Sequence, residues 1–224
     1  MKKKLNIKAL QKEAKEFCNK YSGVYIPELF GVTDGKAIGT FVEHLFQKFL
    51  SERYDIIPGN SASGLDLPSV NTDIKVTSIR QPQSSCPFRD SKQKIYGLGY
   101  HLLLFVYKKE DDVLNRTGML DFVSCVFIDK NRTSDYQITT GIRNIINNNG
   151  NQDDIFAYLI DHNIPADETT LYRIAKELLD NPPKIGFLTI SNALQWRLRY
   201  GRIVSMSEDV DGIARIVKTT DKQG

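Results

Sequence analysis

The sequence predicts an α/β fold in which a mixed β-sheet is flanked by helices. Largely apolar runs at 100–108 and 122–128 are typical of buried strands. Amphipathic spacing over 5–20 and 36–52 predicts helices whose apolar faces need a partner, and a sheet supplies one. Largely apolar strands flanked by such helices indicate a mixed sheet with helices packed on it.

The first part of the chain carries the stronger patterns. Asp34-Gly35 breaks the chain before the second helix, whose apolar residues form one broad arc with Glu43 at its edge. The expected elements are a helix at 5–20, a helix at 36–52, a loop at 58–66, a strand at 70–79, a loop at 80–91, a short helix at 92–99 and strands at 100–108 and 122–128.

Beyond residue 136 the chain is predicted to be helical and to end in a helix and a β-hairpin, with Asp211-Gly212 as the hairpin turn. This change in character predicts a core over 1–135 and a C-terminal part over 136–224 packed on it, with one single domain as the alternative. The expected elements are helices near 137–148, 152–162, 167–181 and 189–200, and strands at 202–207 and 213–218.

Composition excludes several classes of protein. A net charge of +3 over 224 residues excludes a polycationic nucleic-acid binder, so any DNA-binding surface must be local. Three cysteines without a CxxC motif and three scattered histidines argue against a disulfide framework or a zinc site. The most apolar run is too short to span a bilayer, and we expect a cytoplasmic protein without a membrane segment.

Two carboxylates and a lysine stand out beside a glycine- and serine-rich loop. Asp66 ends that loop, and Asp73-Ile74-Lys75 follows on the predicted strand. Because a strand alternates faces, Asp73 and Lys75 point one way and Ile74 points toward a core. Such a set can hold a divalent cation against a phosphate. An exposed strand with a cross-strand ion pair is the alternative interpretation.

The order Ile38-Gly39-x-x-x-Glu43, Asp66, Asp73-x-Lys75 resembles the PD-(D/E)XK nuclease superfamily. More narrowly, it resembles the branch that contains MutH and related type II restriction endonucleases. The resemblance covers about a fifth of the chain and implies a restriction-endonuclease-like fold with 1–135 as the catalytic core. Asp73 stands where MutH has Glu, and Pro68 follows Asp66 instead of preceding it.

This resemblance implies a role for each residue. Asp66 and Asp73 bind Mg²⁺, for which Mn²⁺ substitutes, together with the Ile74 carbonyl and with Glu43 directly or through water. Lys75 orients or deprotonates the attacking water, or neutralises charge on the phosphorane. A further lysine on the following helix can approach the site in this family, and Lys92 or Lys94 fills that place; solvent exposure is the alternative.

Two segments are candidates for DNA contact. The first is the loop after the catalytic strand, where Arg and Gln suit the major-groove edges of guanine and adenine; a plain surface loop is the alternative. The second is the arginine cluster of the predicted C-terminal helix, which reads DNA or forms a solvated face. The candidate residues are Arg80, Gln81, Gln83 and Ser84 in the loop and Arg197, Arg199 and Arg202 in the C-terminal part.

The resemblance favours a type II restriction endonuclease that cuts double-stranded DNA as a homodimer, with a cognate DNA methyltransferase in the same system. One alternative is a MutH-like repair endonuclease that nicks one strand. Another is a noncatalytic DNA-binding regulator with a winged-helix-like C-terminus. Linear plasmid, open circles or intact plasmid distinguish these three.

Overall fold

A computed structural model describes residues 2–56, 64–87, 89–191 and 196–218. Most of the expected loop 58–66 lies outside these residues. The chain forms two compact units, and it passes between them more than once, so the division differs from the expected boundary at residue 135. Unit 1 comprises Met1–Ser84, His101–Ile128 and Val204–Gly224, and unit 2 comprises Ser85–Tyr100 and Asp129–Ile203.

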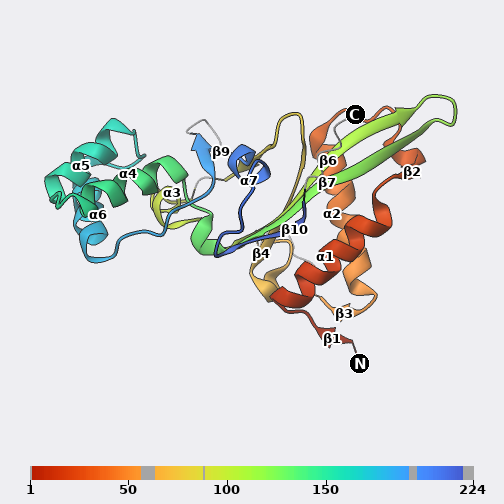
Figure 1. The fold of residues 1–224 in the computed structure, drawn as a ribbon, viewed down its shortest axis with the longest axis horizontal. Coiled ribbons are helices and arrows are strands. Elements are labelled where there is room, and N and C mark those ends of the chain that lie inside the picture. Colours follow the sequence, from red (N-terminus) through yellow and green to blue (C-terminus); the bar gives the residue numbers. More distant parts are fainter. Residues whose placement is uncertain (1, 57–63, 88, 192–195, 219–224) are drawn as a thin grey trace. The chain divides into compact units, whose positions relative to one another are not determined.

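Unit 1 is built on a mixed sheet of five strands in the order β10-β7-β6-β4, with β2 also paired to β7 (Figure 1). Strand β4 runs parallel to β6, and the other pairs are antiparallel. The elements are β1 (Lys3–Lys4), α1 (Ile7–Tyr21), β2 (Val24–Ile26), a 3₁₀ turn (Pro27–Leu29), α2 (Gly35–Ser51), β3 (Tyr54–Asp55), a 3₁₀ turn (Pro68–Val70), β4 (Thr72–Ser78), β6 (His101–Asp112), β7 (Thr117–Ile128) and β10 (Ile213–Val217).

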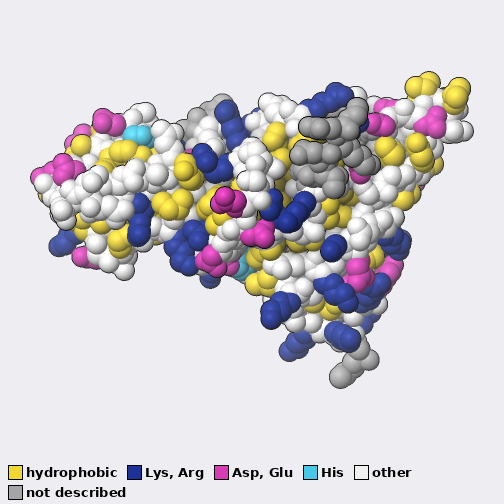
Figure 2. Space-filling view, in the orientation of Figure 1, with side chains coloured by type: hydrophobic (Ala, Val, Ile, Leu, Met, Phe, Trp, Pro, Cys, Tyr) yellow, Lys and Arg dark blue, Asp and Glu magenta, His cyan; other side chains and the backbone are white. Residues whose placement is uncertain are grey.

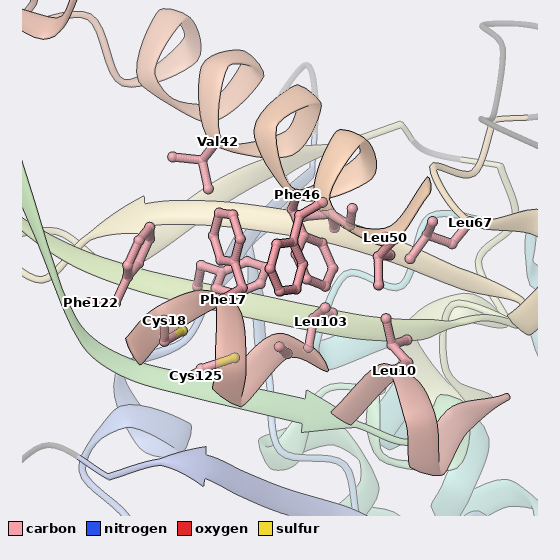
Figure 3. Close-up of a cluster of buried hydrophobic side chains, with 14 of the residues drawn as sticks. Leu10, Phe17, Cys18, Val42, Phe46, Leu50, Leu67, Leu103, Phe122 and Cys125 are labelled. Atoms are coloured by element: carbon pink, nitrogen blue, oxygen red, sulfur yellow. The ribbon is translucent and has the colours of Figure 1, made fainter. Parts of the chain in front are cut away.

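Helices α1 and α2 pack on this sheet through aromatic side chains (Figure 3). The ring of Phe17 on α1 lies 5.0 Å from that of Phe46 on α2 and 5.5 Å from that of Phe105 on β6, both edge to face. Such pairs add to the stabilisation from buried area. The two predicted amphipathic helices and the buried strand at 100–108 are confirmed.

Strands β6 and β7 are longer than expected because their hairpin continues beyond the core. The hairpin tip carries Val113 and Leu114, which are 75% and 94% exposed. Figure 2 shows hydrophobic side chains at the upper right, where the hairpin of Figure 1 ends. The sequence pattern marked only the buried part of each strand, since polar and charged residues fill the rest.

Unit 2 has its own core, in which Ile95 of α3 packs with buried aliphatic residues of α4, α5 and α6. The three long helices predicted for this region are confirmed. A small sheet in the order β5-β9-β8 accompanies them, with the first half of β5 belonging to unit 1. The elements are β5 (Gln83–Cys86), α3 (Gln93–Tyr96), a 3₁₀ turn (Lys130–Arg132), α4 (Tyr136–Asn147), α5 (Gln152–Asp161), α6 (Glu168–Asp180), β8 (Thr189–Ser191), β9 (Trp196–Arg199) and α7 (Gly201–Val204).

The predicted helix over 189–200 is wrong. Residues 189–191 and 196–199 are antiparallel strands β8 and β9. Trp196 and Leu198 are buried while Arg197 and Arg199 are exposed, which is the period of a strand. The winged-helix-like C-terminus therefore lacks its helix.

The predicted hairpin of 202–207 with 213–218 is also wrong. Residues 201–204 form the short helix α7, and β10 pairs antiparallel with β7 in the main sheet. Ala214, Ile216 and Val217 pack on the core of unit 1, and Ile213 is buried. The predicted turn at Asp211-Gly212 does form, with Ile213 N–H donating to the Val210 carbonyl at 2.9 Å, but the strand after it pairs with β7 instead of with 202–207. In the described residues, no helix has the length and apolarity needed to cross a membrane.

Candidate active site

Helix α2 carries one row of residues toward strand β4. Asp34 caps the helix by accepting from the backbone N–H groups of Lys36 and Ala37. A Cβ placed on Gly39 would lie 4.0 Å from Val76 Cβ of β4, so the helix approaches the strand here. Glu43 follows one turn later, on the same side of the helix. The helix thus carries Glu43 toward the strand that bears Asp73.

A tight turn brings Asp66 onto β4. Leu67 and Thr72 exchange backbone hydrogen bonds of 3.0 and 3.2 Å, and the chain reverses between them. Asn71 lies in the left-handed region with φ of 47°, a conformation that Asn tolerates better than most residues. The six-residue gap between Asp66 and Asp73 is therefore the length of one reversal.

Asp66, Asp73 and Lys75 come together on this strand. Asp66 Oδ2 accepts a hydrogen bond of 2.7 Å from the backbone N–H of Ile74. Lys75 Nζ lies 2.7 Å from Asp73 Oδ2. Ile74 is buried in the core, so the predicted alternation of faces along 73–75 is confirmed. Strand β4 ends the sheet order, which leaves its outer edge open to Asp66.

The two carboxyl groups are held in an environment that opposes their charge. Burial raises the pKa of Asp73 to about 7; the positive charge of Lys75 opposes this rise, and the hydrogen bond and charge of Asp66 add to it. Burial also raises the pKa of Asp66, where hydrogen bonds from Asp73 and Ile74 act in the opposite direction and the charge of Glu43 adds to the rise. Acids whose pKa values are shifted by burial and by each other are candidates for a catalytic site.

We expect Asp73→Asn to stabilise the metal-free protein at pH 8. A carboxyl whose pKa rises from 3.8 to about 7 on folding contributes stability that is full below pH 3.8 and is lost as the pH rises through 7. Removing the charge should raise the free energy of unfolding by up to about 4 kcal/mol at pH 8, and by less at pH 5. Urea denaturation in EDTA measures this free energy of unfolding, with the exposed Asp55→Asn as control. An equal gain at both pH values would contradict this expectation.

The other predicted residues of the site lie as follows. Glu43 is half-buried on α2, and its negative charge helps to raise the pKa of Asp66. No three His, Cys, Asp or Glu side chains within the described ranges form a group able to hold a metal ion. In unit 2, Lys92 forms an ion pair of 2.6 Å with Glu177. Lys94 is buried, and burial lowers its pKa, although the negative charge of Asp135 acts in the opposite direction.

The loop expected at 80–91 contains strand β5. Arg80 and Gln81 are exposed, while Gln83 and Ser84 are half-buried in β5. The backbone N–H of Gln83 donates to the Thr77 hydroxyl at 3.1 Å, which fixes this segment to the end of β4. Period-two alternation places Thr77 on the same face as Asp73 and Lys75, but that pattern alone did not indicate this contact.

Gln47 is a second residue that sequence reasoning missed. Its side-chain amide donates to the Asp66 carbonyl at 3.5 Å, the long limit for such a bond. Gly39, Glu43 and Gln47 are spaced four residues apart, so they form one row on α2. That spacing was the available signal.

The chain matches the family model described as type II restriction enzyme NspV over residues 4–215. It is also 52% identical over 214 residues to the type II restriction enzyme NspV of Nostoc sp. (strain ATCC 29411 / PCC 7524), covering 96% of this chain and 97% of that enzyme. No solved structure matches it. This chain therefore belongs to the NspV family of type II restriction enzymes and is a site-specific deoxyribonuclease.

Proposed function

We propose that the chain hydrolyses phosphodiester bonds of double-stranded DNA with Mg²⁺ held by Asp66 and Asp73, and that Mn²⁺ substitutes. One observation carries this proposal: Asp66 is bonded to the backbone of Ile74, between Asp73 and Lys75, which are themselves in contact. Two acids and a lysine are thereby presented together at the edge of β4.

The donor set suits a hard divalent cation. Mg²⁺ prefers oxygen ligands and keeps several waters, so two carboxylates suffice as protein ligands. Burial disfavours the negative charge of both groups, and a cation bound by them would relieve that cost. In a strand, the N–H and C=O of one residue point to the same side. The Ile74 carbonyl therefore points toward the edge where Asp66 lies and is a third candidate ligand.

Side chains of the protein orient the water and stabilise charge beside the bound cation. Bound Mg²⁺ supplies Lewis-acid polarisation of the phosphate and lowers the pKa of an attacking water. Lys75, fixed by Asp73, orients that water and offsets negative charge on the pentacovalent phosphorus. Glu43, one turn beyond Gly39, would accept hydrogen bonds from water near a cation bound by the two aspartates. Ile74 anchors the strand in the core and holds these groups in register.

This arrangement supports assignment to the PD-(D/E)XK type and to its MutH-like branch. The branch pattern of a helix glycine and glutamate, a loop acid and an acid-x-Lys strand has counterparts in Gly39, Glu43, Asp66 and Asp73 with Lys75. A mixed sheet with helices on it, as in unit 1, is compatible with a restriction-endonuclease-like fold.

We further propose a homodimer, because twofold symmetry directs one active site to each strand of a duplex. The cytoplasm, alongside a cognate methyltransferase, is the compartment in which such an enzyme acts. Exposed Arg80 and Gln81, next to the end of β4, are candidates for contact with DNA near the scissile phosphate.

Digestion of supercoiled plasmid in different cations tests the proposal. We expect discrete linear fragments with Mg²⁺ or Mn²⁺, and DNA binding without turnover with Ca²⁺. Open circles alone would replace the restriction mechanism with strand nicking. Efficient cleavage in EDTA or with Ca²⁺ alone would contradict the proposed metal centre.

A further inference from the structure

Residues 181–207 form a segment without acidic side chains. The segment contains four basic residues, Lys184, Arg197, Arg199 and Arg202, and no Asp or Glu, although the chain carries 27 acids in all. Its regular structure consists of strands β8 and β9 and the short helix α7. A local surface of one charge is what a protein of low net charge needs for binding DNA.

The strands β8 and β9 separate polar from apolar residues by face. In their antiparallel register, Thr189 lies opposite Arg199, and Ser191 lies opposite Arg197. Directly opposed residues share a face of the pair. The intervening pair, Ile190 with Leu198, is buried on the other face.

Arg197 and Arg199 are free to bind another molecule. Both are exposed, and in the part of the chain that the structure describes neither side chain makes a hydrogen bond or an ion pair. Other arginines are committed: Arg53 pairs with Glu13 and Glu16. Two exposed guanidinium groups on one face of a strand, without a partner in the described residues, are available to a ligand with several acceptor atoms.

Strands β8 and β9 are fixed to the rest of unit 2 by a buried carboxylate and by their own buried side chains. The buried carboxylate of Asp135 caps α4 by accepting from Ile138 N–H at 3.0 Å and accepts from Ile190 N–H of β8 at 2.7 Å. Trp196 and Leu198 are buried beneath β9. A rigid base of this kind keeps the orientation of the two arginines fixed before a ligand binds.

We infer that the face of Thr189, Ser191, Arg197 and Arg199 is a DNA-reading surface whose two arginines contact base edges in the major groove. That groove admits a β-ribbon, and a guanidinium fork matches the O6 and N7 acceptors of guanine. Residues two apart on a strand are separated by about 7 Å, close to two base steps of about 3.4 Å each. The strand β5 on the other side of β9 adds no acid.

This inference rests on the proposed duplex DNA substrate and adds a specificity element to it. The test compares Arg197→Lys, Arg199→Lys, Arg197→Ala and Arg199→Ala with the parent. The parent first selects its preferred sequence from randomised duplexes in Ca²⁺, and affinities for that duplex and a scrambled one are then measured. Arg173→Lys on α6 is the matched control, because Arg173 is exposed in the same unit.

We expect both lysine variants to lose at least about fivefold in affinity for the selected duplex, because lysine keeps the charge but lacks the bidentate fork. Affinity for the scrambled duplex should stay near that of the parent, as should the melting curve. The alanine variants should lose as much or more on the selected duplex.

Lysine variants that bind the selected duplex as the parent does would overturn the inference, whether or not the alanine variants weaken all DNA equally. If the parent selects and cleaves a sequence that all four variants bind normally, only the reading surface is wrong. If the parent selects no sequence, the reading surface and the proposed function both fail.

Discussion

Asp66→Ala and Asp73→Ala should each reduce single-turnover cleavage of a site-containing duplex by at least about a thousandfold. Each change removes one of two carboxyl groups, the buried Asp73 and the half-buried Asp66, that are in contact at the edge of β4. Loss of one leaves a single carboxylate ligand, which is too few to hold Mg²⁺ against the phosphate. DNA affinity should be unchanged or higher, because a negative charge that repels phosphate has been removed. A gel-shift assay in EDTA measures this DNA affinity.

The exposed Asp55→Ala on β3 is the matched control and should cleave like the parent. Cleavage by Asp73→Ala at the parent's rate would show that the active site lies elsewhere in the chain. Loss of DNA binding along with cleavage, in a protein that still melts cooperatively, would show that the two acids support binding and not chemistry.

Lys75→Met should lower the single-turnover rate by about a hundredfold to a thousandfold while leaving DNA affinity within a few fold. Methionine keeps much of the side-chain volume and removes the charge that lies 2.7 Å from Asp73 Oδ2. The effect falls on the rate because the charge is needed most when negative charge develops on the phosphate.

Lys48→Met is the control for this change, since Lys48 is exposed on the same helix that carries Glu43. It should leave the rate unchanged. A fall in DNA affinity as large as the fall in rate would mean that Lys75 binds the ground-state phosphate and has no special role in the transition state.

The arrangement of the acid-x-Lys strand was predictable because the direction of each side chain depends only on the local backbone. Period-two alternation sets Asp73 and Lys75 on one face and Ile74 in the core, whatever the rest of the fold does. The contact between Asp66 and Ile74 was not predictable in the same way. It depends on the reversal between Leu67 and Thr72 and on the positive φ of Asn71, which no simple sequence pattern specifies.

The C-terminal strands illustrate the opposite case. Ile190 and Leu198 are eight residues apart, a spacing compatible with two helical turns and also with a strand period of two. The alternation Trp196, Arg197, Leu198, Arg199 was the better indicator, because both large apolar residues are buried and both arginines are exposed.

The pairing partner of strand β10 could not be predicted from local sequence patterns. Asp211-Gly212 is a valid hairpin signal, yet Ile213 pairs with Ile128, which lies 85 residues earlier in the chain. Pairing partners at that separation are decided by burial over the whole sheet. The same limit applies to Gln47, whose contact with Asp66 requires α2 to be docked against β4.

Mn²⁺ binding to the protein–DNA complex tests the metal centre most directly, because it reports the bound metal itself and not the cleavage rate. Electron paramagnetic resonance should detect Mn²⁺ bound by the parent on a site duplex with non-hydrolysable linkages at low micromolar to millimolar metal, and much weaker binding by Asp66→Asn and Asp73→Asn. The Asp55→Asn control should bind as the parent does. If both site variants bind Mn²⁺ as tightly as the parent, the carboxylate pair on β4 is not the metal centre.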